Sequence, residues 1–204
     1  DGIGKLERWD GAYYSEQLKK SKFNLDEEEL RPYFSLENVL NGVFDIAGEL
    51  YNIKFTKAPE VEVYHPEVTV YKVTSSQTNQ LVAYVYTDFF PRTTKRAGAW
   101  MSSFKSQCKK NGVDERPQVS VTCNFTKPTA TKPSLLTFGE VTTLFHEFGH
   151  ALHGMLSDTT YPSLSGPHVY WDFVELPSQI FENWCYEKEA LSRFAKNSET
   201  GEII

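Results

Sequence analysis

The five residues from His146 to His150, His-Glu-Phe-Gly-His, could together bind a metal ion and activate water. Histidines four positions apart stand one turn above each other on a helix, so both imidazoles can converge on one ion. Glu147 is displaced from that pair but can reach a water held by the metal. A chance match in a chain with five histidines has a probability on the order of one per cent. The pattern therefore indicates one Zn²⁺ ion with His146 and His150 as ligands and Glu147 as a general base.

A catalytic zinc usually takes three protein ligands, so a third must come from elsewhere in the chain. His153 is one candidate, although a histidine at this spacing is more often a packed neighbour of a ligand. Glu175 is the other, because helical signals resume at Asp172 and Glu175 would lie in the first turn of a second helix. It could instead be the capping-box partner of Asp172, and spacing leaves both roles open. A metzincin site is excluded because Leu156 stands where its third histidine would be.

The helix that must carry the five residues is well delimited by sequence signals. Thr137 and Glu140 form a plausible capping box at its start, and no proline follows until Pro162. Gly149 costs roughly 1 kcal/mol of helix stability relative to alanine. We infer that this glycine admits a closely packed neighbour.

The remaining elements are predicted from caps and hydrophobic periodicity. Asp10 and Ser35 mark the starts of two helices, and a further helical stretch is expected around residues 97–105. Alternating apolar residues predict strands at 61–63, 68–72, 81–85 and 119–123. The strand at 119–124 is either an ordinary core strand or an open edge on which an extended peptide could pair. These signals predict an α+β fold, mainly helical and of the zincin type, with a small antiparallel sheet.

Composition and charge limit the possible partners and the compartment. The net charge of −6 and the lack of a Lys/Arg cluster argue against nucleic acid and anionic membranes. No stretch has the roughly 18 apolar residues that cross a bilayer. The three cysteines are odd in number and widely spaced, which favours a reducing compartment and hence the cytoplasm. We find no internal repeat or linker and expect residues 1–204 to form a single unit.

Several segments around the motif closely resemble the catalytic region of the thimet oligopeptidase family. They are HEFGHALH (146–153), LSGP (164–167), DFVELPSQ (172–179) and ENW (182–184), with further similar segments over most of the chain. The resemblance implies that His146, His150 and Glu175 bind zinc and that Glu147 is the catalytic base. It also implies an activity, the hydrolysis of peptide bonds in short peptides by an oligopeptidase or a peptidyl-dipeptidase, and leaves the choice between these two open.

Members of that family are several times longer than this chain. The resemblance therefore implies that residues 1–204 are part of a catalytic domain, with amino-terminal and carboxyl-terminal portions absent. Family tyrosines and a histidine that support the transition state lie in the later portion, so we expect the isolated chain to be poorly active. Its newly exposed surfaces could drive self-association. The rival interpretation is a non-catalytic zinc-binding module or an inactive fragment.

Overall fold

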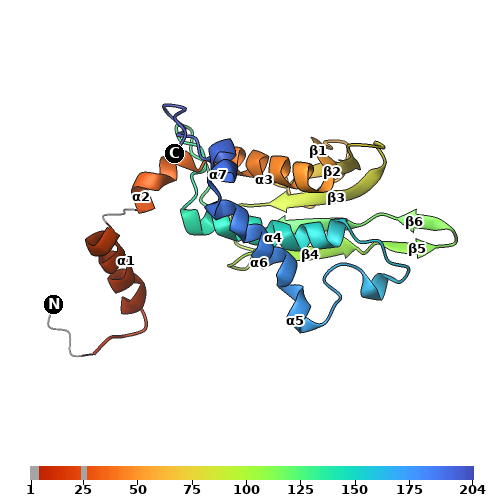
Figure 1. Ribbon diagram of the computed structural model, residues 1–204, viewed down its shortest axis with the longest axis horizontal. Coiled ribbons are helices and arrows are strands. Elements are labelled where there is room, and N and C mark those ends of the chain that lie inside the picture. The colour runs from red at the N-terminus through yellow and green to blue at the C-terminus, as the bar shows by residue number, and fades with distance from the viewer. Residues whose placement is uncertain (1–4, 24–26) are drawn as a thin grey trace.

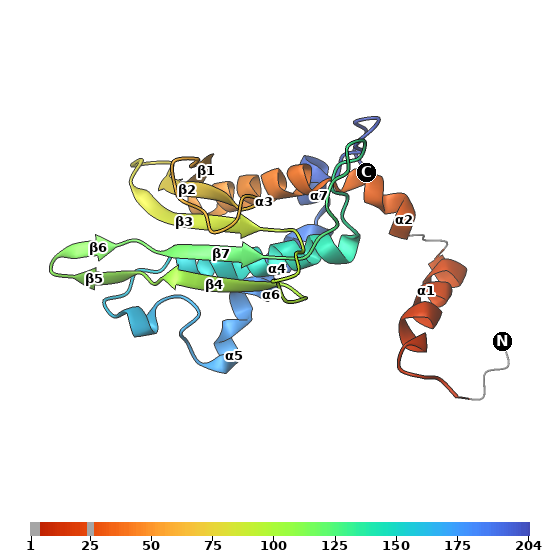
Figure 2. The same ribbon diagram turned by 180° about the vertical axis from the view of Figure 1, so that it is seen from behind.

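The computed structural model describes residues 5–23 and 27–204. The helices of residues 36–51 and 138–155 lie over one face of a sheet, whereas the helix of residues 10–23 lies away from it (Figures 1 and 2). The α-helices are α1 (Asp10–Phe23), α2 (Glu27–Leu30), α3 (Leu36–Tyr51), α4 (Phe138–Met155), α5 (Trp171–Val174), α6 (Leu176–Glu182) and α7 (Lys188–Phe194). The strands are β1 (Ile53–Lys57), β2 (Thr69–Ser75), β3 (Leu81–Asp88), β4 (Trp100–Lys105), β5 (Cys108–Lys110), β6 (Val113–Glu115) and β7 (Gln118–Thr122). Within these described residues, no helix is long and apolar enough to cross a membrane.

The main sheet has five strands in the order β1-β2-β3-β7-β4, and β5 and β6 form a separate hairpin. Neighbouring strands are antiparallel except for β3 and β7, which run parallel. A small antiparallel sheet was expected, and the observed sheet is mixed because one of its strand pairs is parallel. Parallel neighbours need a long connection. Residues 89–117 supply it, because they contain β4 and the hairpin and return the chain to the sheet between β3 and β4.

Two local predictions failed in the first half of the chain. Residues 100–105, expected to be helical, form β4, because pairing with β7 overrides local helix propensity. The segment at 61–63 is a loop, and the first strand is β1 instead. Val61 packs against a small apolar cluster on the sheet, which explains its apolar character without a strand.

Helices α3 and α4 share one continuous core with the sheet. Ser35 caps α3 as predicted, since its side chain accepts a hydrogen bond from the Asn38 amide at 3.3 Å. The buried side chains of α3 recur at helical spacing and meet α4 and the sheet over a core that includes Val39, Val43, Val73, Val85, Val121, Leu144, Phe145 and Phe148. A helix starts at Asp10, but Asp10 lies in the first turn of α1 and its carboxylate accepts a hydrogen bond from the preceding Glu7 amide, so the expected cap is not formed. Helix α1 buries none of its side chains.

Helix α4 is held at both ends by side chains. The predicted capping box is present at its start, where Thr137 and Glu140 bond reciprocally. At its end, the Arg116 guanidinium donates to the carbonyl oxygens of Met155 at 2.9 Å and Ser157 at 3.2 Å. A cation at this end also interacts favourably with the helix dipole. Arg116 lies just before β7 in the chain, so these two hydrogen bonds connect the end of α4 to the sheet.

Candidate metal centre

Helix α4 places His146 and His150 on one face, with their ring centroids 4.9 Å apart. Glu175 reaches the same point from the neighbouring chain segment. Its Oε2 lies 3.2 Å from the Nε2 atom of each histidine. The three side chains offer ligand atoms that all lie within 4.8 Å of one another. The structure thus brings together the two histidines and the glutamate that the sequence singled out.

Glu175 is positioned differently from the prediction. It lies at the junction of two short helices, after α5 ends at Val174 and before α6 begins at Leu176. The break precedes Pro177, which has no amide hydrogen and disfavours helical geometry in the residue before it. The expected cap at Asp172 is also wrong, since the residue at the N-cap of α5 is Tyr170 and makes no side-chain cap.

Two polar residues of α6 hold the candidate ligands in place. The Ser178 hydroxyl donates to the Glu175 carboxylate at 2.9 Å, and Glu182 Oε1 lies 2.5 Å from His146 Nδ1. Neither residue has a predicted role from its sequence position. A signal was available, because positions three and seven residues after Glu175 fall on one helical face.

Gly149 allows α6 to approach α4 closely, as the sequence analysis inferred. A Cβ atom built on Gly149 would lie 2.5 Å from the Pro177 carbonyl oxygen and 2.6 Å from the Ser178 Cα. Backbone atoms cannot tolerate such contacts without moving. Only glycine therefore lets the segment that bears Glu175 lie directly over the histidine pair.

Glu147 is buried, with 8% of its surface exposed, and Met101 of strand β4 is its backbone hydrogen-bond partner. Burial raises the pKa of Glu147, and the nearby Glu175 carboxylate adds to that increase. His146 and a backbone hydrogen bond with Met101 act in the opposite direction but do not cancel it. A carboxylate with a raised pKa is a better proton acceptor near neutral pH, as a general base must be.

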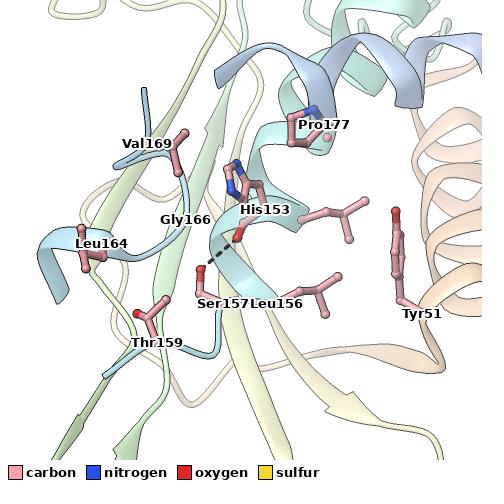
Figure 3. A pocket seen from close by; sticks show the side chains of 11 residues that line it. Tyr51, His153, Leu156, Ser157, Thr159, Leu164, Gly166, Val169 and Pro177 are labelled. Atoms are coloured by element: carbon pink, nitrogen blue, oxygen red, sulfur yellow. Dashed lines mark hydrogen bonds between the residues drawn. The ribbon is translucent and has the colours of Figure 1, made fainter. Parts of the chain in front are cut away.

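His150 and His153, which follow His146 in α4, lie in different surroundings. Burial lowers the pKa of His150, which favours the neutral imidazole that can bind a metal. His153 does not join the three converging side chains and instead lines a cavity of about 290 Å³, together with Pro177 and Leu156 (Figure 3). Its Nδ1 atom is buried and has no hydrogen-bond partner among the residues that the structure describes, and its ring lies against Phe173. The geometry favours Glu175 over His153 as the third donor.

The strand edge nearest to Glu147 belongs to β4. The structure corrects the proposed edge at 119–124, because β7 is paired on both sides, with β3 and β4. Strand β4 is the last of the five and, among the described strands, pairs with β7 alone. The accessible sheet edge beside the candidate base is therefore residues 100–105.

The chain was compared with known proteins over its full length. The sequence model of peptidase family M3 matches residues 1–204. Oligopeptidase A of Salmonella typhimurium is 43% identical over 205 residues, covering 100% of this chain and 30% of that protein. Dipeptidyl carboxypeptidase of Escherichia coli is 44% identical over 194 residues, covering 95% and 28%. Organellar oligopeptidase A of Arabidopsis thaliana is 43% identical over 206 residues, covering 98% and 26%.

These comparisons confirm the resemblance drawn from the motif segments, because they find both kinds of enzyme that it implied. The homologues are peptidases, and each aligns with nearly all of this chain. The chain spans less than a third of the length of these three relatives. Family and whole-chain similarity agree, and the chain belongs to peptidase family M3.

Proposed function

We propose that this chain carries the zinc site of a peptidase that hydrolyses short peptides, with His146, His150 and Glu175 as the ligands. The donor set supports this proposal, since two imidazoles and one carboxylate leave a fourth position for water, as in catalytic zinc sites. Ligand atoms about 2.0–2.1 Å from a tetrahedral ion lie roughly 3.3 Å from one another. The observed separations of 3.2 Å from Glu175 to each histidine fit that value. This match is the observation that carries the proposal.

Glu147 is the proposed general base. When bound, zinc supplies Lewis acidity, lowering the pKa of a coordinated water toward about 7 and polarising the scissile carbonyl. Glu147 lies one residue from His146, beside the ligand pair, and its environment raises its pKa. It would accept the proton of the attacking water and return it to the leaving amine, so a single carboxylate serves both halves of the reaction.

An extended peptide would be held along β4. An unpaired strand edge offers main-chain hydrogen bonds, which give affinity with little sequence preference. The backbone amide of Met101 in β4 donates a hydrogen bond to the Glu147 carboxylate, so a peptide paired with this strand would pass close to the base. A helix with two histidine ligands that runs beside an edge strand fits the zincin type of core.

The cytoplasm is the proposed location. Cys108, Cys123 and Cys185 are all free thiols in the structure. Burial also raises the pKa values of Cys123 and Cys185 far above the usual range, which keeps these two thiols protonated and unreactive. Buried free thiols are compatible with a reducing compartment.

The rival proposal, a zinc-binding module without activity, is tested with Glu147→Gln. We expect this variant to bind one zinc ion as tightly as the wild type, because Glu147 is not a ligand. In the longer protein that contains this chain, the same substitution should abolish hydrolysis, because an amide accepts no proton. Zinc content is measured by mass spectrometry, and turnover with a quenched fluorescent peptide. Near-normal turnover by the variant contradicts the base assignment, and a wild-type chain without tight zinc contradicts the site itself.

The same assay is run on this chain and on the longer protein that contains it. Removing a donor that stabilises the transition state commonly costs about a hundredfold or more in rate. The family resemblance places such donors outside this chain, so we expect the chain to bind zinc but to turn over far more slowly. Equal turnover per bound zinc would show that the other segments are dispensable. Mass spectrometry of the products then separates removal of carboxyl-terminal dipeptides from internal cleavage.

A further inference from the structure

His146 contacts two different carboxylates through its two ring nitrogens. Its Nε2 atom lies 3.2 Å from Glu175 Oε2, and its Nδ1 atom lies 2.5 Å from Glu182 Oε1. Both glutamates come from the segment that packs across α4, one at the start of α6 and one at its end. The imidazole is therefore fixed at both nitrogens by side chains of a single neighbouring segment.

We propose that Glu182 is a positioning residue that selects the tautomer and ring orientation with which His146 binds a metal. A carboxylate can only accept a hydrogen bond from an imidazole N–H, so Glu182 holds the proton on Nδ1. The Nε2 atom faces Glu175 across the proposed metal position, so it would present its lone pair to an ion bound there. This inference rests on the proposed zinc site and names a residue that acts through a ligand rather than as one.

The geometry excludes Glu182 as a fourth ligand. The two ring nitrogens of an imidazole point in divergent directions, so a carboxylate bonded to Nδ1 lies behind the ring as seen from Nε2. In agreement, the ligand atoms that lie within 4.8 Å of one another come from His146, His150 and Glu175, without Glu182. Glu182 can therefore influence a bound ion through the imidazole of His146.

A purely structural tie between α4 and α6 explains the contact less well. The two helices already pack through Gly149 against Pro177 and through Phe145 against Phe181, whose rings lie 5.3 Å apart. The side chains of His146 and Glu182 remain 26% and 32% exposed, and partly exposed pairs contribute little to folding. In metal sites, by contrast, loss of the hydrogen-bond partner of a histidine ligand typically weakens affinity 10- to 100-fold.

The test compares Glu182→Ala and Glu182→Gln with Glu187→Gln. Alanine removes the hydrogen bond, whereas glutamine keeps an acceptor of similar shape without the charge. Glu187 is an exposed glutamate five residues further along, so its substitution makes the same change in net charge away from His146. Zinc affinity is measured by competition with a chromophoric chelator, and the stability of the metal-free protein by thermal unfolding. Nitrogen-15 NMR of labelled histidines reports the tautomer of His146.

We expect Glu182→Ala to weaken zinc binding roughly 10- to 100-fold and Glu182→Gln to weaken it less. In the metal-free Glu182→Ala protein, the His146 proton should shift from Nδ1 toward Nε2, where the Glu175 carboxylate can accept a hydrogen bond, while the unfolding temperature changes little. Unchanged zinc affinity or an unchanged tautomer in Glu182→Ala would overturn the positioning role. An equal loss in Glu187→Gln would overturn it too, since a charge effect would then suffice. Failure of the wild-type chain to bind zinc would instead refute the proposed function.

Discussion

Replacing Gly149 with alanine tests whether close contact between α4 and α6 sets the position of Glu175. The new Cβ atom would lie 2.5 Å from the Pro177 carbonyl oxygen, about 0.9 Å short of an ordinary contact at 3.4 Å. The two atoms nearest to the new Cβ, the Pro177 carbonyl oxygen and the Ser178 Cα, belong to the backbone, so a side-chain rotation cannot relieve the clash. The start of α6 must move away from α4 by nearly 1 Å, and Glu175, two residues before Pro177, must move with it.

Two opposing terms determine the cost in stability. Overpacking typically destabilises by about 1–3 kcal/mol. Alanine regains roughly 1 kcal/mol of helix propensity, which leaves a net loss of up to about 2 kcal/mol. For a chain of this size each kcal/mol lowers the melting temperature by about 2–4 °C, so a decrease of up to roughly 8 °C is expected. The affinity for zinc should decrease more than the stability, because the distance between a metal ion and its ligand can depart from its standard value by only about 0.2 Å. We expect zinc binding to weaken by at least about tenfold.

Gly139→Ala is the matched control, since it makes the same substitution in the first turn of the same helix. A Cβ atom there would meet only the Thr137 hydroxyl, at 3.9 Å. Thermal unfolding followed by circular dichroism and zinc competition titrations are performed on both variants. The control should be neutral or slightly more stable and should bind zinc normally. A Gly149→Ala protein with wild-type stability and wild-type zinc affinity would refute the claim that this contact positions Glu175.

Two further predictions concern the third ligand and acid stability. Glu175→Ala should weaken zinc binding severely while His153→Ala retains it, and titrations showing the reverse would transfer the ligand role to His153. Asp88 is buried, and burial alone would raise its pKa. Hydrogen bonds from Arg92, Lys95 and Tyr64 outweigh this effect and lower the pKa. Its stabilising effect is therefore complete above its unfolded pKa of about 3.9 and is lost as the pH falls through the lower folded value. Asp88→Asn should cost roughly 3–5 kcal/mol at pH 7 and progressively less in acid, and urea unfolding that shows a constant difference would contradict this account.

The parts of the site that depend on local sequence were predictable. The start of α4 follows from Thr137 and Glu140, whose reciprocal bonds need only a four-residue segment. The alignment of His146 and His150 follows from helix geometry alone. Ser35 likewise marks the start of α3 because its hydroxyl bonds a nearby amide. In each case the interacting groups are neighbours in the chain, so their pattern is visible without knowledge of the fold.

The parts that failed depend on contacts between distant residues. Residues 100–105 become a strand because β7, which follows in the sequence, pairs beside them. The parallel pairing of β3 and β7 cannot be read from alternation, which is the same for both strand directions. The structure places Glu175 beside His146 and His150, but its position between two short helices depends on the break before Pro177. The interaction of Glu182 with His146 joins residues 36 positions apart and needs the packing of α6 on α4.

The sheet and the helix are connected in a way that fixes the candidate base relative to the edge strand. Gly154 brings α4 so close to β4 that an added Cβ would lie 2.6 Å from the Met101 side chain. The Met101 backbone amide also donates a hydrogen bond to the carboxylate of Glu147, which lies two turns before Gly154 in α4. Arg116 anchors the end of α4 by bonding the Met155 carbonyl oxygen. Rotation of α4 that moved Glu147 would have to break these contacts together, so the fold holds the base against the strand on which we propose that a peptide pairs.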